Sequence, residues 1–352
     1  MEQIMDYLKQ AVASGVSDLF VVPGAPMTGK NEGLMKPLRS DRLMPEDTQV
    51  LIREIYGLAQ RDIEGYLRTG DDDFSFSVPG LARFRVNTYR QRGSLAAVIR
   101  VVAFDIPDFR ELGIPEQVMA LSRHTGGMIL VTGTAGCGKS TTLACLVDQI
   151  NKQRACHIIT LEDPIEYLHR NQKSIVSQRE IAVDTEDYLT ALRACLRQAP
   201  DVIQLGEMRD LETIRTAMTA AETGHLVLAT LHTRGAVNTI DRIIDTFPAD
   251  QQDQIRIQLS NVLRTVVSQQ LVPDTRGGQI PVFEIMHMTG AVRSMIRDCK
   301  THQIPAAIAS GGADGMVSMD QALFEAYGAG KITAQTALDY AENPEQMQRR
   351  MA

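Results

Sequence analysis

The stretch GMILVTGTAGCGKSTTLACLVDQI, residues 127–150, combines an apolar run, a glycine-rich turn and a helical pattern. A phosphate-binding loop needs glycines, because successive backbone N–H groups must converge on phosphate oxygens, and a lysine and a hydroxyl residue for the terminal phosphates and magnesium. The helix that follows adds partial positive charge at its N-terminus. Residues 128–131 predict the strand, Lys139 is the cation, and Ser140 is the hydroxyl that would ligate Mg²⁺. We therefore expect ATP to be bound by Gly133, Thr134, Ala135, Gly136, Cys137, Gly138, Lys139, Ser140 and Thr141.

A second stretch, GAPMTGKN at residues 24–31, has the same spacing of glycine and lysine. Asn31 stands where the magnesium hydroxyl should be, and Gly33 and Pro37 disfavour a helix downstream. We interpret this stretch as a surface hairpin loop that holds no phosphate.

The pattern of strand-like and helix-like segments changes along the chain. Residues 1–102 mix short β-type runs with helical stretches, one of them near residues 49–67, which predicts a small α+β domain. From about residue 113 apolar β-type runs alternate with helices, as a parallel sheet covered by helices requires. After about residue 237 the pattern is almost wholly helical. Two prolines in FDIPDFRELGIP favour extended backbone, so we predict domains at 1–104 and 114–352 with a linker at 105–113.

The composition is that of a globular protein: 352 residues, 44% of them hydrophobic. The 36 basic and 43 acidic residues give a net charge of −7, which argues against a broad electrostatic grip on nucleic acid. Five cysteines, an odd number without a Cys-x-x-Cys pair, favour a reduced cytosolic protein. No apolar run reaches about 18 residues and the N-terminus lacks a signal-peptide pattern, so we expect no insertion into a membrane.

Carboxylates close two apolar runs. Glu207 ends DVIQLGE, where it could hold magnesium through water or orient the attacking water, or merely cap the next helix. The second run ends in TLEDPIEYLHR, which contains Glu162, Asp163 and Glu166. One of these three could act as general base, and their spacing does not decide which.

Four blocks in order, GTAGCGKSTTL, ITLEDPIEYLH, the segment from DVIQLGEMRD to LATLHT, and NTIDRIIDTFPADQQ, carry a resemblance that spans roughly residues 17–315. They resemble the Walker A, Asp-box, Walker B and His-box blocks of the secretion ATPase superfamily, and most of all those of PilT-like type IV pilus retraction ATPases. The resemblance implies an α/β protein, with an N-terminal PAS-like α+β domain linked to a RecA-like P-loop ATPase domain and a helical C-terminal part.

The resemblance also implies roles for single residues. Glu166 matches the general base and Glu207 the Walker B glutamate, while His225 and His232 match the pair thought to sense the γ-phosphate. Arg85 and Arg92 fall where the N-terminal domain sends side chains toward the nucleotide. Without the resemblance, the interpretation of either histidine is a residue at the end of a strand whose hydrogen bonds are made within the fold. The arginines would then lie on a solvent-exposed strand face.

By the same resemblance the chain is an ATP-hydrolysing motor that powers pilus retraction and twitching motility. It implies a homohexamer at the inner face of the cytoplasmic membrane, with an inner-membrane platform protein and a paralogous pilus ATPase as partners. The missing long N-terminal region and zinc module, and a helix GAVRSMIRD similar to one of retraction ATPases, favour retraction. A pilus assembly or type II secretion ATPase, an accessory retraction subunit and a nucleic-acid translocase are the alternatives.

Cys137 stands in the loop where family members usually have serine. A thiol at a helix N-terminus can have a lowered pKa, so we expect Cys137 to be oxidisable.

Overall fold

The computed structural model describes residues 2–31, 34–102 and 106–352. The chain divides into two compact units, made chiefly of residues 1–105 and 106–352. Residue 105, the first of the predicted linker, lies outside the described residues, and turns occupy residues 109–113. The linker and domain boundaries therefore stay a prediction.

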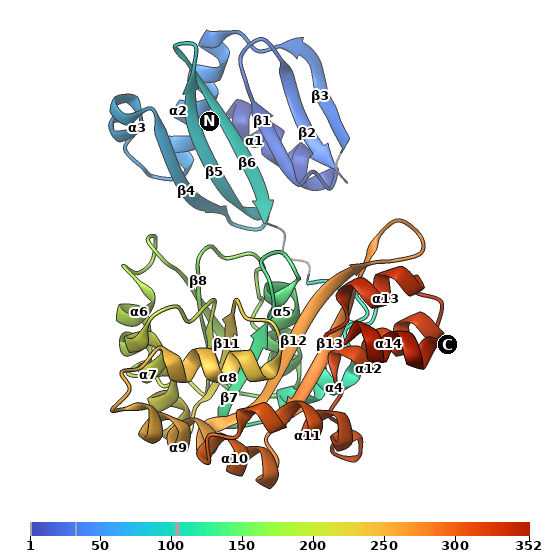
Figure 1. Cartoon of the computed structure of the whole chain (residues 1–352). Coiled ribbons are helices and arrows are strands. Elements are labelled where there is room, and N and C mark those ends of the chain that lie inside the picture. The colour runs from blue at the N-terminus through green and yellow to red at the C-terminus, as the bar shows by residue number, and fades with distance from the viewer. Residues whose placement is uncertain (1, 32–33, 103–105) are drawn as a thin grey trace. The chain divides into compact units, whose positions relative to one another are not determined.

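The first unit is a six-stranded antiparallel sheet in the order β3-β2-β1-β6-β5-β4 (Figure 1). Three helices pack against it, and their apolar side chains form one core with those of the sheet. In β5, Phe84 and Val86 are buried while Arg83 and Arg85 alternate with them onto the other face. The elements are α1 (Glu2–Ala13), β1 (Asp18–Val21), β2 (Pro26–Asn31), β3 (Leu34–Arg42), α2 (Pro45–Leu58), α3 (Glu64–Thr69), β4 (Asp71–Val78), β5 (Ala82–Gln91) and β6 (Ser94–Val102).

Two expectations for this unit need correction. The stretch 24–31 is no loop: most of it forms β2, which pairs with β1 and β3 because Met27 is buried in the core. The helix expected near residues 49–67 is two helices, α2 and α3. Gln60 between them has a left-handed backbone with φ of 51°, which ends the first helix.

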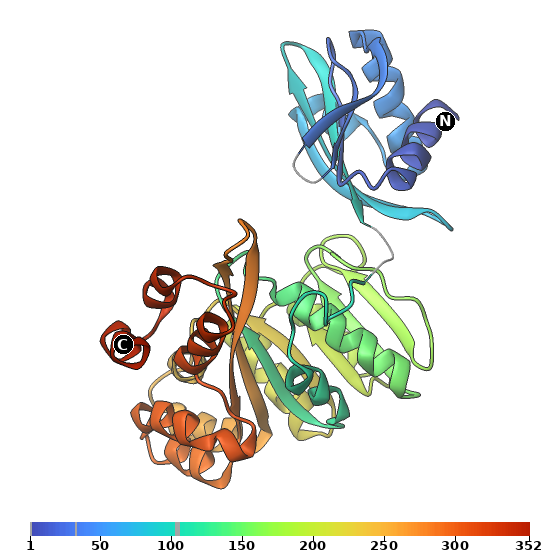
Figure 2. The same ribbon diagram turned by 90° about the vertical axis from the view of Figure 1, so that its right-hand side faces the viewer.

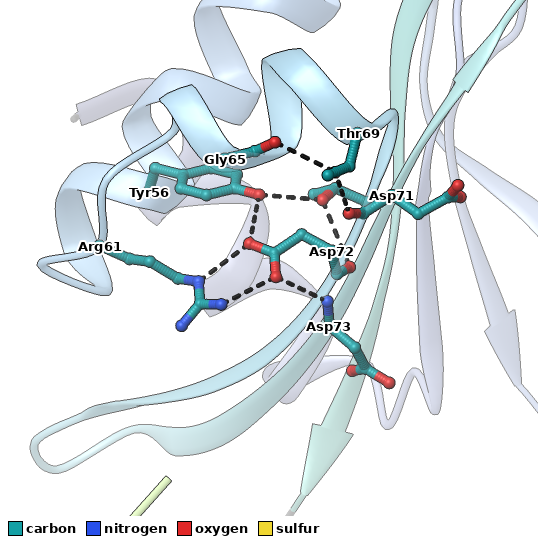
Figure 3. A network of polar contacts seen from close by, with 8 residues as sticks. Tyr56, Arg61, Gly65, Thr69, Asp71, Asp72 and Asp73 are labelled. Carbon is teal, nitrogen blue, oxygen red and sulfur yellow. Dashed lines mark hydrogen bonds and ion pairs between the residues drawn. The ribbon is translucent and has the colours of Figure 1, made fainter. Parts of the chain in front are cut away.

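A polar network secures this break (Figure 3). The guanidinium of Arg61 donates to both carboxylate oxygens of Asp72 in β4, at 2.9 and 2.8 Å, and the hydroxyl of Tyr56 donates to the same carboxylate at 2.9 Å. Burial opposes ionisation of Asp72, but the hydrogen bonds from Arg61 and Tyr56 outweigh it and lower the pKa of this carboxyl. The network thus ties the turn after α2 to the start of β4.

The second unit is a seven-stranded sheet in the order β13-β12-β7-β11-β10-β8-β9, parallel except for the edge strand β13. Figures 1 and 2 show helices on both of its faces. Leu143 and Leu146 of α5 pack on one face, and helices α6 to α11 contribute to the core on the other. Together the two units confirm the predicted α/β fold class.

In the first part of this unit the elements are α4 (Glu116–Met119), β7 (Gly127–Thr132), α5 (Lys139–Gln153), β8 (His157–Glu162), β9 (Ile175–Glu180), α6 (Tyr188–Cys195), β10 (Val202–Leu205), α7 (Leu211–Glu222) and β11 (Leu226–Leu231). They continue with α8 (Ala236–Asp245), α9 (Gln252–Val262), β12 (Leu263–Pro273), β13 (Gln279–His287), α10 (Gly290–Arg297), α11 (Ile304–Ser310), α12 (Met319–Gly328), α13 (Ala334–Tyr340) and α14 (Pro344–Met351).

The sequence pattern predicts an almost wholly helical region after about residue 237, and this prediction is wrong. The strands β12 and β13 form an antiparallel hairpin, and β12 pairs in parallel with the central strand β7. A separate small core joins this hairpin to the C-terminal helices through Val272, Val282, Met319 and Leu323. The hairpin therefore links the C-terminal helices to the middle of the sheet.

Candidate active site

The glycine-rich loop connects the end of β7 to the N-terminus of α5, as the sequence predicts. Gly133, Gly136 and Gly138 have φ of 145°, 76° and 91°, which side-chain-bearing residues rarely adopt. A Cβ at Gly133 would lie 2.3 Å from the backbone oxygen of Gln269, so this position has no room for a side chain. The ammonium of the buried Lys139 donates to the backbone oxygens of Gly133 and Thr134 at 3.0 and 2.8 Å.

Much of the rest of the loop is exposed, with Cys137 as the buried exception. Thr134, Ala135, Gly136 and Ser140 are exposed, and Thr141 is half-buried. Backbone N–H groups and the N-terminus of a 15-residue helix suit a polyphosphate here. Ser140 would offer its hydroxyl to Mg²⁺.

Cys137 does not have the lowered pKa that we expected. Its side chain is turned inward, so that Sγ lies 2.5 Å from where a Cβ of Gly133 would stand, and the residue is only 3% exposed. Burial raises the pKa of the thiol, and the nearby charge of Lys139 only partly offsets this. The expectation of a lowered pKa was wrong because burial outweighs the charge of Lys139.

Glu207 follows β10 at the same edge of the sheet as the loop, where the parallel strands end. Its carboxylate contacts Arg209 Nε at 2.5 Å and His232 Nε2 at 3.4 Å. The Glu207 side chain is 12% exposed and that of His232 is 48% exposed. His232 follows Leu231, which pairs with Thr132 just before the loop. The structure therefore brings Glu207, His232 and the phosphate-binding loop to one edge.

The ends of β8 and β10 also meet there. The backbone N–H of Gly206 donates to the oxygen of Leu161 at 2.8 Å, and the hydroxyl of Tyr188 lies against Gly206. Burial and then the charges of Glu207, Asp163 and Glu162 raise the pKa of Tyr188. The negative charges of three carboxylates therefore act on one half-buried hydroxyl, although in the described part of the chain no group of three or more Asp, Glu, His or Cys side chains is placed to hold a metal ion.

Two of the three candidate bases, Glu162 at the end of β8 and Glu166 in the loop after it, differ in their surroundings. Glu162 is 9% exposed, and its carboxylate accepts hydrogen bonds from Thr160 at 2.5 Å and Gln178 at 3.1 Å. Glu166 is exposed in the loop between β8 and β9, and among the described residues no hydrogen bond holds its carboxylate. An exposed carboxylate is free to reach a substrate, whereas Glu162 is committed to the fold.

His225 lies at the opposite edge of the sheet from the loop. It precedes Leu226, which pairs with Gly127 at the start of β7, and its Nδ1 lies 2.9 Å from the backbone oxygen of Ala220. Within one chain the structure does not bring His225 to Glu207 or Lys139. Its assignment as a γ-phosphate sensor stays a prediction.

The two arginines lie in the first unit. Arg85, in β5, forms an ion pair with Asp73 at 2.9 Å. Arg92 is exposed in the tight turn between β5 and β6, with φ of 49°. Their approach to a nucleotide also stays a prediction.

The polar residues of the β12–β13 hairpin are not among the site residues predicted from the sequence. Gln269 touches the phosphate-binding loop, and Ser268 and Glu284 hold the start of α8. Burial raises the pKa of Glu284 to about 7, and the nearby charge of Glu342 adds to this. The signal that could have found them is the β-branched run before Ser268 together with the Gly-Gly turn at 277–278.

Among the described residues, no helix combines the length and apolarity that a membrane span requires.

A solved structure of the pilus retraction motor PilT with bound ADP is similar to the structure of this chain. It superposes with a TM-score of 0.88 at 44% sequence identity, covering 98% of this chain and 99% of that one. The ATPase DotB of Legionella pneumophila superposes with a TM-score of 0.78 at 25% identity, covering 95% and 93%.

Sequence comparison also finds similarity to PilT. The type IV pilus retraction ATPase PilT of Pseudomonas aeruginosa is 43% identical over 97% of this chain and 99% of its own length. The type IV pilus ATPase PilU of the same organism is 39% identical over 96% and 88%. These matches confirm the resemblance to PilT-like ATPases. Residues 1–316 match the family described as type II/IV secretion system protein, and the chain belongs to that family.

Proposed function

We propose that this chain is an ATP-hydrolysing motor that powers the retraction of type IV pili. The observation that carries the proposal is its near full-length similarity to PilT, a pilus retraction ATPase, together with a glycine loop built for phosphate. ADP is the nucleotide bound in the related PilT structure. ATP is the substrate that we assign to this chain.

The loop residues 133–141 would bind the triphosphate. Lys139 would exchange its two carbonyl contacts for phosphate oxygens, and Ser140, with Glu207 through water, would hold Mg²⁺. The bound cation neutralises part of the triphosphate charge. Glu207 is held by Arg209 and His232, so it is oriented before the substrate arrives.

Glu166 is the general base of the proposal: its exposed carboxylate orients the attacking water and takes its proton. His232 lies beside Glu207 and would respond to the γ-phosphate, whereas His225, at the far edge, would act through a subunit boundary. Arg85 and Arg92, from a neighbouring subunit or domain, would stabilise the charge that spreads over the transferring phosphoryl group.

The motor would work as a homohexamer at the cytoplasmic face of the inner membrane. Hydrolysis would change the angle between the two domains, with residues 106–113 as the hinge. Closure around the ring would turn a membrane platform protein and release pilin subunits.

A second candidate is favoured by the similarity to PilU, a type IV pilus ATPase that is 39% identical. In that case the chain works beside another pilus ATPase of the same cell. Deleting the partner's gene would then abolish retraction even though this chain still hydrolyses ATP.

Phosphate release by the purified protein tests the enzymatic part. We expect hydrolysis of ATP, and a loss of at least about a hundredfold in Lys139→Ala, because the buried ammonium faces the place of the terminal phosphates. Lys152→Ala is the matched control: Lys152 lies in the same helix but pairs with Asp148 at 2.5 Å, far along it from the loop. Turnover by Lys139→Ala near the wild-type rate would refute the site, and stimulation of the wild type by DNA or RNA would favour a translocase.

A further inference from the structure

The β12–β13 hairpin contains Gln269, a buried glutamine to which the proposed ATP hydrolysis assigns no role. β12 pairs with β7 up to Ser268 and Thr132. Gln269 is therefore the first residue of β12 beyond the end of β7, level with the start of the phosphate-binding loop. It is only 3% exposed, and a buried polar side chain in a strand needs a polar partner.

The side chain of Gln269 is directed at the far end of the loop. Its Oε1 accepts a hydrogen bond from the hydroxyl of Thr142, in the first turn of α5, at 2.7 Å. Its Nε2 lies 2.9 Å from where a Cβ of Gly138 would stand. The amide thus occupies the space beneath the junction of loop and helix.

The backbone of the same residue supports the near end. The oxygen of Gln269 lies 2.3 Å from the place of a Cβ at Gly133, the residue that joins β7 to the loop. One residue therefore contacts both points where the loop is anchored. Between them, the loop's own N–H groups must keep a fixed spacing to match phosphate oxygens.

Ser268, the residue before Gln269 in β12, contacts the segment that follows His232. Ser268 Oγ accepts from the backbone N–H of Gly235 at 2.9 Å. Glu284, the cross-strand partner of Ser268 in β13, accepts from the N–H of Ala236 at 2.7 Å. Gly235 and Ala236 begin α8 only three residues after His232.

We propose that Gln269 is a positioning residue of the nucleotide site: it fixes both ends of the phosphate-binding loop, and through Ser268 its strand also holds the segment that follows His232. This inference rests on the proposed function in that the loop must bind nucleotide. It adds a residue that acts through the loop and not on the substrate.

The test is the affinity for a fluorescent ADP analogue, measured by titration of the full-length protein after its thermal unfolding has been recorded. Gln269→Leu keeps the volume but removes the amide, and we expect the Kd to rise on the order of tenfold. Thr142→Val removes only the hydroxyl that donates to Gln269 and should weaken binding similarly. Gln270→Ala, the adjacent and less buried glutamine of β12, should stay within about twofold of wild type.

The double variant Gln269→Leu with Thr142→Val separates positioning from general damage. Because both changes break one link, the double variant should bind about as weakly as either single variant. Losses that multiply, or wild-type affinity in Thr142→Val, would overturn the inference even if Gln269→Leu fails to fold. A wild-type protein that binds no nucleotide would refute the proposed function as well, whereas tight binding by every variant refutes the inference alone.

Discussion

Single side chains at the edge of the parallel sheet decide whether this chain can hydrolyse ATP. The exposed Glu166 and the buried Glu162 lie four residues apart, but only Glu162 is held by hydrogen bonds from Thr160 and Gln178. The sequence could place both carboxylates after a strand. Their different surroundings depend on packing against β9, which no local pattern predicts.

Glu166→Gln should retain ATP binding and lose about a hundredfold or more in turnover, because the amide can still contact water but cannot take its proton. Steady-state phosphate release and nucleotide titration measure the two effects separately. Glu186→Gln, also exposed in the β9–α6 connection, is the matched control and should leave both unchanged. Wild-type turnover in Glu166→Gln would show that another group is the base.

Cys137 should resist alkylation, since its thiol is buried and its pKa is raised. Cys299 is exposed and should react first with iodoacetamide in the folded protein. Peptide mapping by mass spectrometry after a short exposure measures both rates. Equal labelling of the two cysteines would mean that the loop opens far more often than its contacts indicate.

The strands and helices could be predicted only where their sequence signals are local. The run at 128–131 and the glycines after it gave β7, the loop and α5 correctly. β12 was missed because it follows α9 directly at Leu263, without a glycine or proline, and because Ser268 and Gln269 interrupt its apolar run. Those polar residues are there for contacts with the loop and with α8, which lie far away in the sequence.

The break between α2 and α3 also depends on a distant contact. Arg61 reaches Asp72, so Asp72→Asn should lower the free energy of unfolding by about 1–3 kcal/mol at pH 7. Chemical denaturation measures this change. Asp71→Asn, at an exposed neighbouring position, is the control and should have little effect. An unchanged free energy of unfolding in Asp72→Asn would contradict the role of the network.

The lowered pKa of Asp72 predicts that the free energy of unfolding depends on pH. The pKa of Asp72 is lower in the folded than in the unfolded chain, so its contribution is complete above the unfolded value of about 3.9 and is lost as the pH falls through the lower, folded value. The stability difference between wild type and Asp72→Asn should therefore shrink below about pH 4. A difference that grows on acidification would reverse this assignment.

The chain combines a unit with an antiparallel sheet and a unit with a mostly parallel sheet, and it is similar to PilT over nearly its full length. Four ordered motifs allowed the family and the fold class to be predicted, because each motif demands a defined strand, loop and helix. The contact of Arg85, Arg92 and His225 with a bound nucleotide could not be derived from the motifs in the same way. In the proposed motor it depends on neighbouring subunits and on the angle between the domains, which one chain's local sequence does not encode.

The central claim is that this ATPase removes subunits from a pilus, and a count of surface pili tests it most directly. The chromosomal copy would be replaced by Glu207→Ala, which removes the carboxylate that contacts Arg209 and His232. Excess surface pili together with lost twitching is the result that retraction predicts. Bald cells would contradict it and would mean that the motor drives assembly or export.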